Sequence, residues 1–159
     1  AKDIYDEPQW PKDPLFYANF PSLTDITAAP EGMESGFFLV PLAPGIEDTE
    51  ELRNEYFDKI IDRFEFLTQQ TVKSNIIFKQ SFCKNDFVSE YNSYKGNAYG
   101  MANTLLQTAF LRPKLKSSKV KNLYFTGQLT VPGPGVPPAL ISGKLVSELI
   151  DKQLLNHNV

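Results

Sequence analysis

The chain has 159 residues, of which 42% are hydrophobic and 22% are charged, so it is long enough to form a packed core. Its formal net charge of −3 gives no field that would attract a polyanion, and we therefore exclude nucleic acid as a partner. With one cysteine, Cys83, and one histidine, His157, the chain cannot form an internal disulfide and offers little material for a zinc site or for Cys/His or Ser/His/Asp catalysis.

The start of the chain and its hydropathy suggest where the protein works. Its longest apolar stretches are far shorter than the ~20 residues that a membrane-spanning helix needs, and no signal peptide opens the chain. We therefore expect a soluble or peripheral protein in the cytoplasm. Because the chain begins at Ala1 and enters at once on a sequence typical of a domain interior, we also expect it to be part of a longer protein; the alternative is a processed N-terminus, which would look the same.

Two short apolar stretches near the N-terminus are typical of strands. Residues 15–20 and 36–42 are bounded by prolines and by the turn signal at 29–32, which predicts an antiparallel pair. Residues 37–40 are apolar without interruption, so both faces of the second strand should be covered.

An amphipathic helix is predicted over residues 49–68, where apolar residues recur at helical spacing from Leu52 to Leu67. Asp48 is expected to cap the helix, with Glu51 reaching back as in a capping box. The acidic cluster at this end could also be read as a catalytic carboxylate pair. Capping and a favourable interaction with the helix dipole are the simpler explanation.

The middle of the chain predicts a further strand at 76–82 and a short polar helix or turn at 83–91. Cys83 has no base beside it, so we interpret it as a small, half-buried hydrophobic residue. Residues 98–111 carry few charges and are predicted to form a helix that ends before Arg112, which precedes a proline.

Five positive charges follow within ten residues. We interpret this basic stretch as a solvated loop; the alternative is contact with anionic lipid or with a cofactor phosphate. The residues are Arg112, Lys114, Lys116, Lys119 and Lys121.

The last third of the chain reads as a buried strand at 123–126, a loop rich in glycine and proline, and a helix from about 137 to 153. Glycines at 127, 133 and 135 allow close backbone approach and leave N–H groups directed at the helix start. Such a point suits an electron-rich ring edge, such as that of a reduced flavin. The same glycines could equally serve only the geometry of the loop.

The amino-acid sequences of this segment and of two earlier segments resemble those of a known family. Residues 123–143, LYFTGQLTVPGPGVPPALISG, resemble the C-terminal signature of phytoene desaturases and related carotenoid desaturases. Residues 97–113, NAYGMANTLLQTAFLRP, resemble a second block of that family. The APEG sequence at 29–32, followed by the apolar stretch at 37–41, resembles a third, and the three blocks stand in the family's order.

The resemblance implies the C-terminal part of an FAD-dependent oxidoreductase that desaturates a lipid-soluble isoprenoid or carotenoid, with hydride transfer to the flavin. It also implies an α+β fold that becomes α/β at the C-terminal end. Residues 1–92 would form a substrate-side region with an antiparallel sheet and packed helices. Residues 93–159 would supply the final strand and helix of a Rossmann-like FAD domain.

The resemblance further implies which residues contact the flavin ring. Many members of the family have histidine where this chain has Val131, so no proton-transfer role is assigned and the catalytic residues stay unknown. We expect Gly135 to be sensitive to substitution and Ser142, one turn into the helix, to be tolerant. The implied FAD contacts are Gly127, Pro132, Gly133, Gly135, Val136 and Pro137.

The dinucleotide fingerprint G-x-G-x-x-G, which holds the pyrophosphate in such enzymes, is absent from the chain. The FAD site is therefore expected to be incomplete, with a missing N-terminal FAD domain as partner, and the chain alone is expected to be inactive. An unpaired edge on the last strand suggests a homo-oligomer. The alternative reading is a free-standing module that binds a hydrophobic ligand or a membrane surface, without catalysis.

Overall fold

The computed structural model describes residues 2–102, 104–108 and 111–157. The chain divides into two compact units, Ala1–Asn97 and Ala98–Val159. The division lies close to the boundary at residue 92 that the sequence suggested. The assignment of the two parts to a substrate side and a flavin side stays a prediction.

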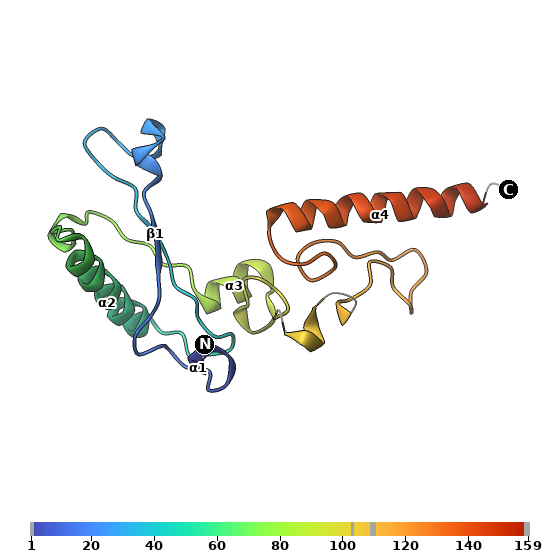
Figure 1. Ribbon diagram of the computed structural model, residues 1–159, viewed down its shortest axis with the longest axis horizontal. Helices are drawn as coiled ribbons and strands as arrows, with labels where there is room; N and C mark the ends of the chain where they lie inside the picture. Colours follow the sequence, from blue (N-terminus) through green and yellow to red (C-terminus); the bar gives the residue numbers. More distant parts are fainter. Residues whose placement is uncertain (1, 103, 109–110, 158–159) are drawn as a thin grey trace. The chain divides into compact units, whose positions relative to one another are not determined.

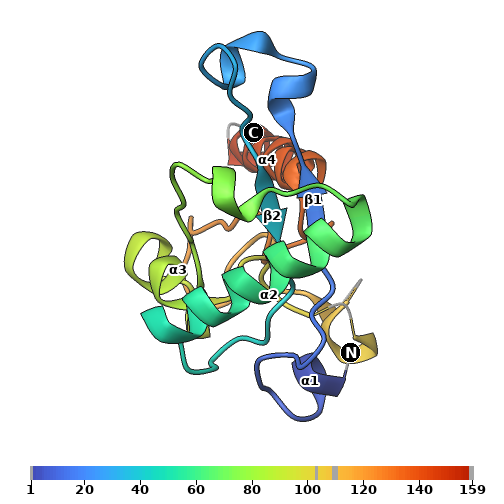
Figure 2. The same ribbon diagram turned by 90° about the vertical axis from the view of Figure 1, so that its left-hand side faces the viewer.

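The first unit contains a two-stranded antiparallel sheet, as predicted. β1 (Tyr17–Asn19) pairs with β2 (Phe37–Leu39), with Tyr17 opposite Leu39. Both strands are shorter than expected, because Pro21 and Pro41 follow soon after their last residues and proline cannot donate to a ladder. Figure 2 shows that the chain between the strands forms a projecting loop. It carries two short 3₁₀ helices, Pro21–Leu23 and Ile26–Ala28.

The long helix of this unit, α2 (Glu50–Thr68), confirms the predicted helix at 49–68. Its cap differs from the prediction, since Thr49 Oγ1 accepts the hydrogen bond from Leu52 N–H at 3.3 Å. Asp48 lies one residue too early in the sequence to cap the helix. Its carboxylate instead accepts a hydrogen bond from Arg53. The helix ends at Gln69, whose left-handed backbone (φ 56°) lets its N–H bond to the carbonyl of Glu65 at 2.8 Å.

Aromatic side chains join α2 to the sheet. The ring centroid of Phe64 lies 5.3 Å from that of Phe38 on β2 and 5.6 Å from that of Phe20, distances typical of aromatic pairs. Phe37 points away from this cluster and is 52% exposed. Leu39, on the same face of β2 as Phe37, is half-buried, so the described residues cover this face in part, and the prediction that both faces are covered is confirmed only in part. Helix α2 also buries Tyr56, Ile60 and Ile61.

The predicted strand at 76–82 is absent from the structure, which has only a 3₁₀ helix, Lys73–Asn75, before an irregular segment. The side chains of Ile77 and Phe78 are 79% and 78% exposed. The composition favours a strand, yet a strand forms only where another edge accepts its hydrogen bonds, and the described part of the chain supplies none there.

Helix α3 (Lys84–Tyr91) confirms the predicted short helix, and the N–H of Cys83 donates to Asp86 Oδ2 at its start, at 2.7 Å. Cys83 is half-buried, as predicted, and burial raises the pKa of its thiol. The unit also contains α1 (Lys2–Tyr5) and a 3₁₀ helix, Tyr94–Gly96.

In the second unit, the predicted helix at 98–111 is wrong for the described residues, which form only the 3₁₀ helix Leu105–Gln107. Residues 103, 109 and 110 lie outside the described part. One physical cause is Gly100, which adopts φ +82° and so interrupts a right-handed helix.

The predicted buried strand at 123–126 is reduced to an antiparallel bridge between Lys116 and Tyr124. Leu123 and Phe125 are 40% and 44% exposed, so the segment is not buried. A Rossmann-like strand would need parallel neighbours, and the described residues provide none. The predicted final helix is confirmed as α4 (Val136–His157), which Figure 1 shows running beside the preceding loop. The described residues form a mixed α+β fold, and the Rossmann-like part of the expected fold stays a prediction.

Among the described residues, no helix combines the length and the apolar character that crossing a bilayer requires.

Candidate functional site

The glycine-rich loop between Phe125 and α4 requires its glycines for conformational reasons. Gly127, Gly133 and Gly135 adopt φ values of +102°, +141° and +113°. L-residues with a side chain are strained in this region, so each position favours glycine. The loop is therefore shaped by glycine torsions whatever it binds.

The glycines differ in what surrounds them. A Cβ built on Gly127 would meet no atom within 4 Å, and one on Gly135 would make only an ordinary contact of 3.4 Å with Pro138. Gly133 is buried, and a Cβ there would lie 3.3 Å from Arg112 Cζ. The loop thus leaves open space beside Gly127, is in ordinary contact with Pro138 beside Gly135, and is closed beside Gly133.

The other implied contact residues lie at the end of this loop. Val136 is 75% exposed, and Pro132 and Pro137 are also exposed. The N-terminus of α4 is a weaker donor than the sequence suggested, since Val136 is followed by two prolines and proline has no N–H. The first turn of α4 therefore directs fewer N–H groups toward a ligand than an ordinary helix start.

Ser142 ties the beginning of the loop to α4. Its side chain is fully buried, and its Oγ accepts a hydrogen bond from Gly127 N–H at 2.7 Å and lies 2.7 Å from Thr126 Oγ1. The hydroxyl also donates to the Ala139 carbonyl at 2.6 Å. The expectation that Ser142 tolerates substitution is thus contradicted by its contacts. A serine within an apolar helix face was the signal available in the sequence.

Arg112 departs from the rest of the basic stretch. It is only 4% exposed, whereas Lys114, Lys119 and Lys121 lie in solvent. Lys116 is also exposed, and its Nζ donates to Gln153 Oε1 at 2.7 Å. The interpretation as a solvated loop therefore holds for the lysines and is wrong for Arg112.

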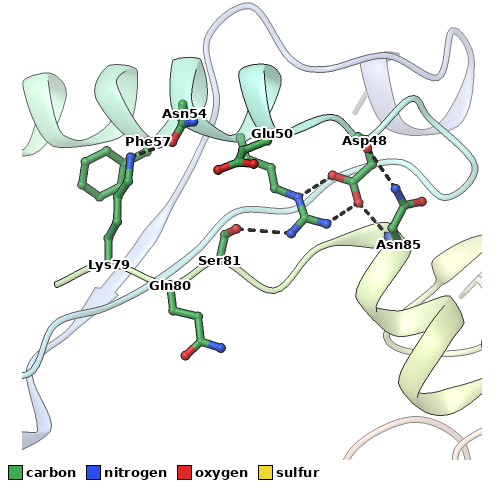
Figure 3. A pocket seen from close by; sticks show the side chains of 9 residues that line it. Asp48, Glu50, Asn54, Phe57, Lys79, Gln80, Ser81 and Asn85 are labelled. Atoms are coloured by element: carbon green, nitrogen blue, oxygen red, sulfur yellow. Dashed lines mark hydrogen bonds and ion pairs between the residues drawn. The ribbon is translucent and has the colours of Figure 1, made fainter.

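A concave site lies in the first unit, where the start of α2 meets the segment before α3 (Figure 3). Its cavity of about 480 Å³ falls within the usual size of a small-molecule site. The lining residues are Asp48, Glu50, Arg53, Asn54, Phe57, Lys79, Gln80, Ser81 and Asn85.

Polar side chains in this pocket are paired with one another. Arg53 Nε and Nη2 donate to the two carboxylate oxygens of Asp48 at 2.6 and 2.7 Å, and the Asn85 N–H donates to Asp48 Oδ2 at 2.7 Å. Lys79 Nζ donates to Asn54 Oδ1 at 2.6 Å. Figure 3 shows these bonds crossing between the walls of the pocket. We therefore interpret the pocket as a structural network.

The electrostatics of Asp48 support this interpretation. Hydrogen bonding to Arg53 holds the pKa of the Asp48 carboxyl below its usual range, so the group stays ionised and is a weak base. Asp48 of the acidic cluster is thus structural, although it pairs with Arg53 rather than capping α2 as the simpler interpretation supposed. Among the described residues, no group of three or more His, Cys, Asp or Glu side chains could hold a metal ion.

Comparison with known proteins found curated relatives over most of the chain. The chain is 46% identical over 148 residues, 93% of its length, to a carotenoid 3,4-desaturase of Haloarcula japonica. The chain is homologous to carotenoid desaturases. It is also 35% identical over 146 residues to a 4,4'-diapophytoene desaturase of Staphylococcus aureus, and 32% identical over 145 residues to a zeta-carotene-forming phytoene desaturase of Myxococcus xanthus.

The match to these desaturases covers 87% of the chain for the staphylococcal and myxococcal proteins. The chain spans only about 30% of the length of the desaturases that it matches, consistent with a C-terminal part of the family. No family model matches the chain.

Proposed function

We propose that the protein containing this chain is an FAD-dependent desaturase that introduces a double bond into an isoprenoid or carotenoid chain. The observation that carries the proposal is the glycine loop before α4, with open space beside Gly127, in a chain 46% identical to a carotenoid 3,4-desaturase. Bound FAD would supply the acceptor for a hydride taken from the C–C bond that becomes unsaturated.

The loop fits a flat ring better than a bulky or highly charged group. Beside Gly127 a Cβ would meet nothing within 4 Å, so the backbone itself can form one wall of a thin slot. Gly135 lies at the start of α4, where Val136 still has its N–H. We propose that Gly127, Pro132, Gly133, Gly135, Val136 and Pro137 bind and orient the ring in this slot.

The roles proposed for this chain are enclosure and orientation. Hydride removal from an apolar chain depends on positioning and exclusion of water more than on acid and base groups. The described residues supply apolar side chains rather than a catalytic polar cluster, including Ile77 and Phe78 in the first unit and Leu105 and Leu106 in the second, all at least 78% exposed. We propose that the first unit contributes to the substrate side.

The phosphate half of the cofactor site is proposed to come from a part of the protein outside this chain. The sequence has no G-x-G-x-x-G fingerprint, and the relatives are about three times as long as the matched segment. The chain alone would therefore lack desaturase activity. Peripheral contact with a membrane that holds the lipid-soluble substrate is part of this proposal.

The test is cofactor identification in the protein that contains the chain. The purified protein is denatured, and the released small molecules are identified by mass spectrometry. We expect one FAD per polypeptide. A protein that folds but carries no flavin, even after incubation with excess FAD, contradicts the proposal.

A further inference from the structure

The second unit contains a buried positive charge beside the glycine-rich loop. Arg112 is 4% exposed, and its guanidinium lies against Gly133: a Cβ on that glycine would be 3.3 Å from Cζ and 3.5 Å from both Nε and Nη2. Arginine is a cationic side chain, and here it lies in a place of reduced dielectric.

Glycine at position 133 makes this close contact possible. Gly133 adopts φ +141°, and any side chain there would press on the guanidinium. Because no side chain lies between the Gly133 backbone and the guanidinium, the positive charge is close to the loop. Its electrostatic potential therefore extends to a ligand bound on the other side of the loop. At Lys114, two residues along, the side chain is exposed and solvent screens the charge.

A second observation concerns the start of α4. Helix N-termini ordinarily stabilise negative charge through their free N–H groups, but Pro137 and Pro138 remove two of the first three. A site at this loop that must accept negative charge therefore needs another source of positive potential. Arg112 is the buried cation next to the same loop.

We propose that Arg112 is an electrostatic residue of the flavin site, which stabilises the negative charge that appears on the ring edge when the bound flavin is reduced. The inference rests on the proposed function. In an environment of low dielectric, a fixed cation favours the anionic reduced form over the neutral oxidised form. Arg112 thus raises the reduction potential of the flavin and favours hydride uptake from the substrate.

The alternative is that Arg112 has only a structural role and stabilises the conformation of the loop. The two roles separate by charge, since Arg112→Met keeps the length of the side chain but loses the charge, and Arg112→Lys keeps the charge but loses the planar fork. A purely structural role would be lost in both variants, whereas the electrostatic effect would be lost only in Arg112→Met.

The experiment measures the two-electron reduction potential of the flavin, by equilibration with a reference dye, in the protein that contains this chain. Sulfite, which forms an anionic adduct with oxidised flavin, serves as a second probe. For Arg112→Met we expect the ratio of reduced to oxidised flavin affinity to fall at least ten-fold, which is about 30 mV for a two-electron couple. Sulfite affinity should fall by a similar factor.

Control variants separate an effect of the charge from an effect on the structure of the loop. Arg112→Lys should keep most of the potential, and Lys114→Met, at an exposed position, should leave it unchanged. If Arg112→Met retains no flavin, Arg112→Gln, which keeps hydrogen-bond donors without charge, replaces it. An unchanged potential and sulfite affinity in the neutral variant overturn the inference, as does an equal loss in Arg112→Lys. A wild-type protein without flavin overturns the proposed function itself, which is a separate outcome.

Discussion

The Gly127 N–H donates a hydrogen bond to Ser142 Oγ at 2.7 Å, and this bond fixes the entry of the glycine-rich loop to the first turns of α4. The same hydroxyl lies 2.7 Å from Thr126 Oγ1 and bonds to the Ala139 carbonyl. One buried side chain therefore holds two neighbouring loop residues against the helix that follows the loop.

Ser142→Ala should destabilise the second unit by about 1–3 kcal/mol, because it leaves the buried N–H of Gly127 without its acceptor. Urea unfolding of the 159-residue chain measures this change. Ser118→Ala, at an exposed position, is the matched control and should change little. Equal midpoints for the two variants would show that the Ser142 network contributes nothing.

Gly135→Val should remove flavin from the protein that contains this chain while most of its fold persists. Valine is branched, and at φ +113° the strain is on the order of 1–3 kcal/mol. The loop would shift to relieve it, and the slot beside Gly127 and Gly135 would close. Flavin content per folded protein and the melting temperature are measured together.

The control for Gly135→Val is Gly32→Val, since Gly32 also has positive φ (+74°) but lies in a loop of the first unit with nothing within 4 Å of a Cβ. It should lower the melting temperature and leave flavin content intact. A Gly135→Val protein that melts early but retains full flavin would contradict a cofactor role for this loop.

Asp48→Asn should destabilise the first unit by about 2–4 kcal/mol, because it removes the carboxylate that pairs with Arg53 inside the pocket. Chemical unfolding checks the size of the loss. Glu55→Gln, which breaks the exposed pair with Lys59, is the control and should have a small effect. An equally small effect of Asp48→Asn would show that the pocket network is not structural.

The same pair fixes the sign of a pH dependence. The pKa of Asp48 is lowered in the folded state, so its contribution is complete above the unfolded value of ~3.9 and is lost as the pH falls through the folded value. The wild-type chain should therefore lose more stability between pH 5 and acid than Asp48→Asn does, by roughly the difference seen at neutral pH.

The exposed lysines of the basic stretch should bring the protein that contains this chain to anionic membranes. Each basic residue near such a surface contributes roughly 1 kcal/mol, and salt weakens the attraction. Reversing the charge of Lys114, Lys119 and Lys121 should abolish flotation with anionic liposomes. Reversal of Lys2, Lys12 and Lys144, which lie elsewhere in the sequence, controls for net charge. Flotation that is the same in both triple variants leaves the stretch as a solvated loop.

Local signals in the sequence predicted the elements that depend on local interactions. Helices α2 and α4 and the pair of β1 with β2 follow from periodicity, proline positions and a turn signal. The capping residue of α2 was misplaced by one, because Asp48 satisfies Arg53 instead. The strand at 76–82 failed, because strand formation depends on a partner edge that composition does not reveal.

The conformation of the candidate loop was predictable only in part, and its site residues stay a prediction. The glycines followed from the motif, and their positive φ values give the physical reason for them. The burial of Arg112 was not predictable, since it depends on how the loop folds against that side chain, and the serine within an apolar helix face signalled a role for Ser142 without naming its partners. In the sequence, Arg112 precedes several lysines, and this composition wrongly suggests that its side chain is exposed to solvent.

The most direct test of the account mixes the oxidised, flavin-loaded protein that contains this chain with an acyclic carotenoid precursor in the absence of oxygen. The account predicts that the visible absorption of the flavin bleaches as the substrate gains a double bond, with one desaturation per flavin reduced, and that a Gly135→Val protein shows neither change. Conversion of the substrate with no bleaching of the flavin, or an unchanged substrate with a fully bound flavin, would contradict it.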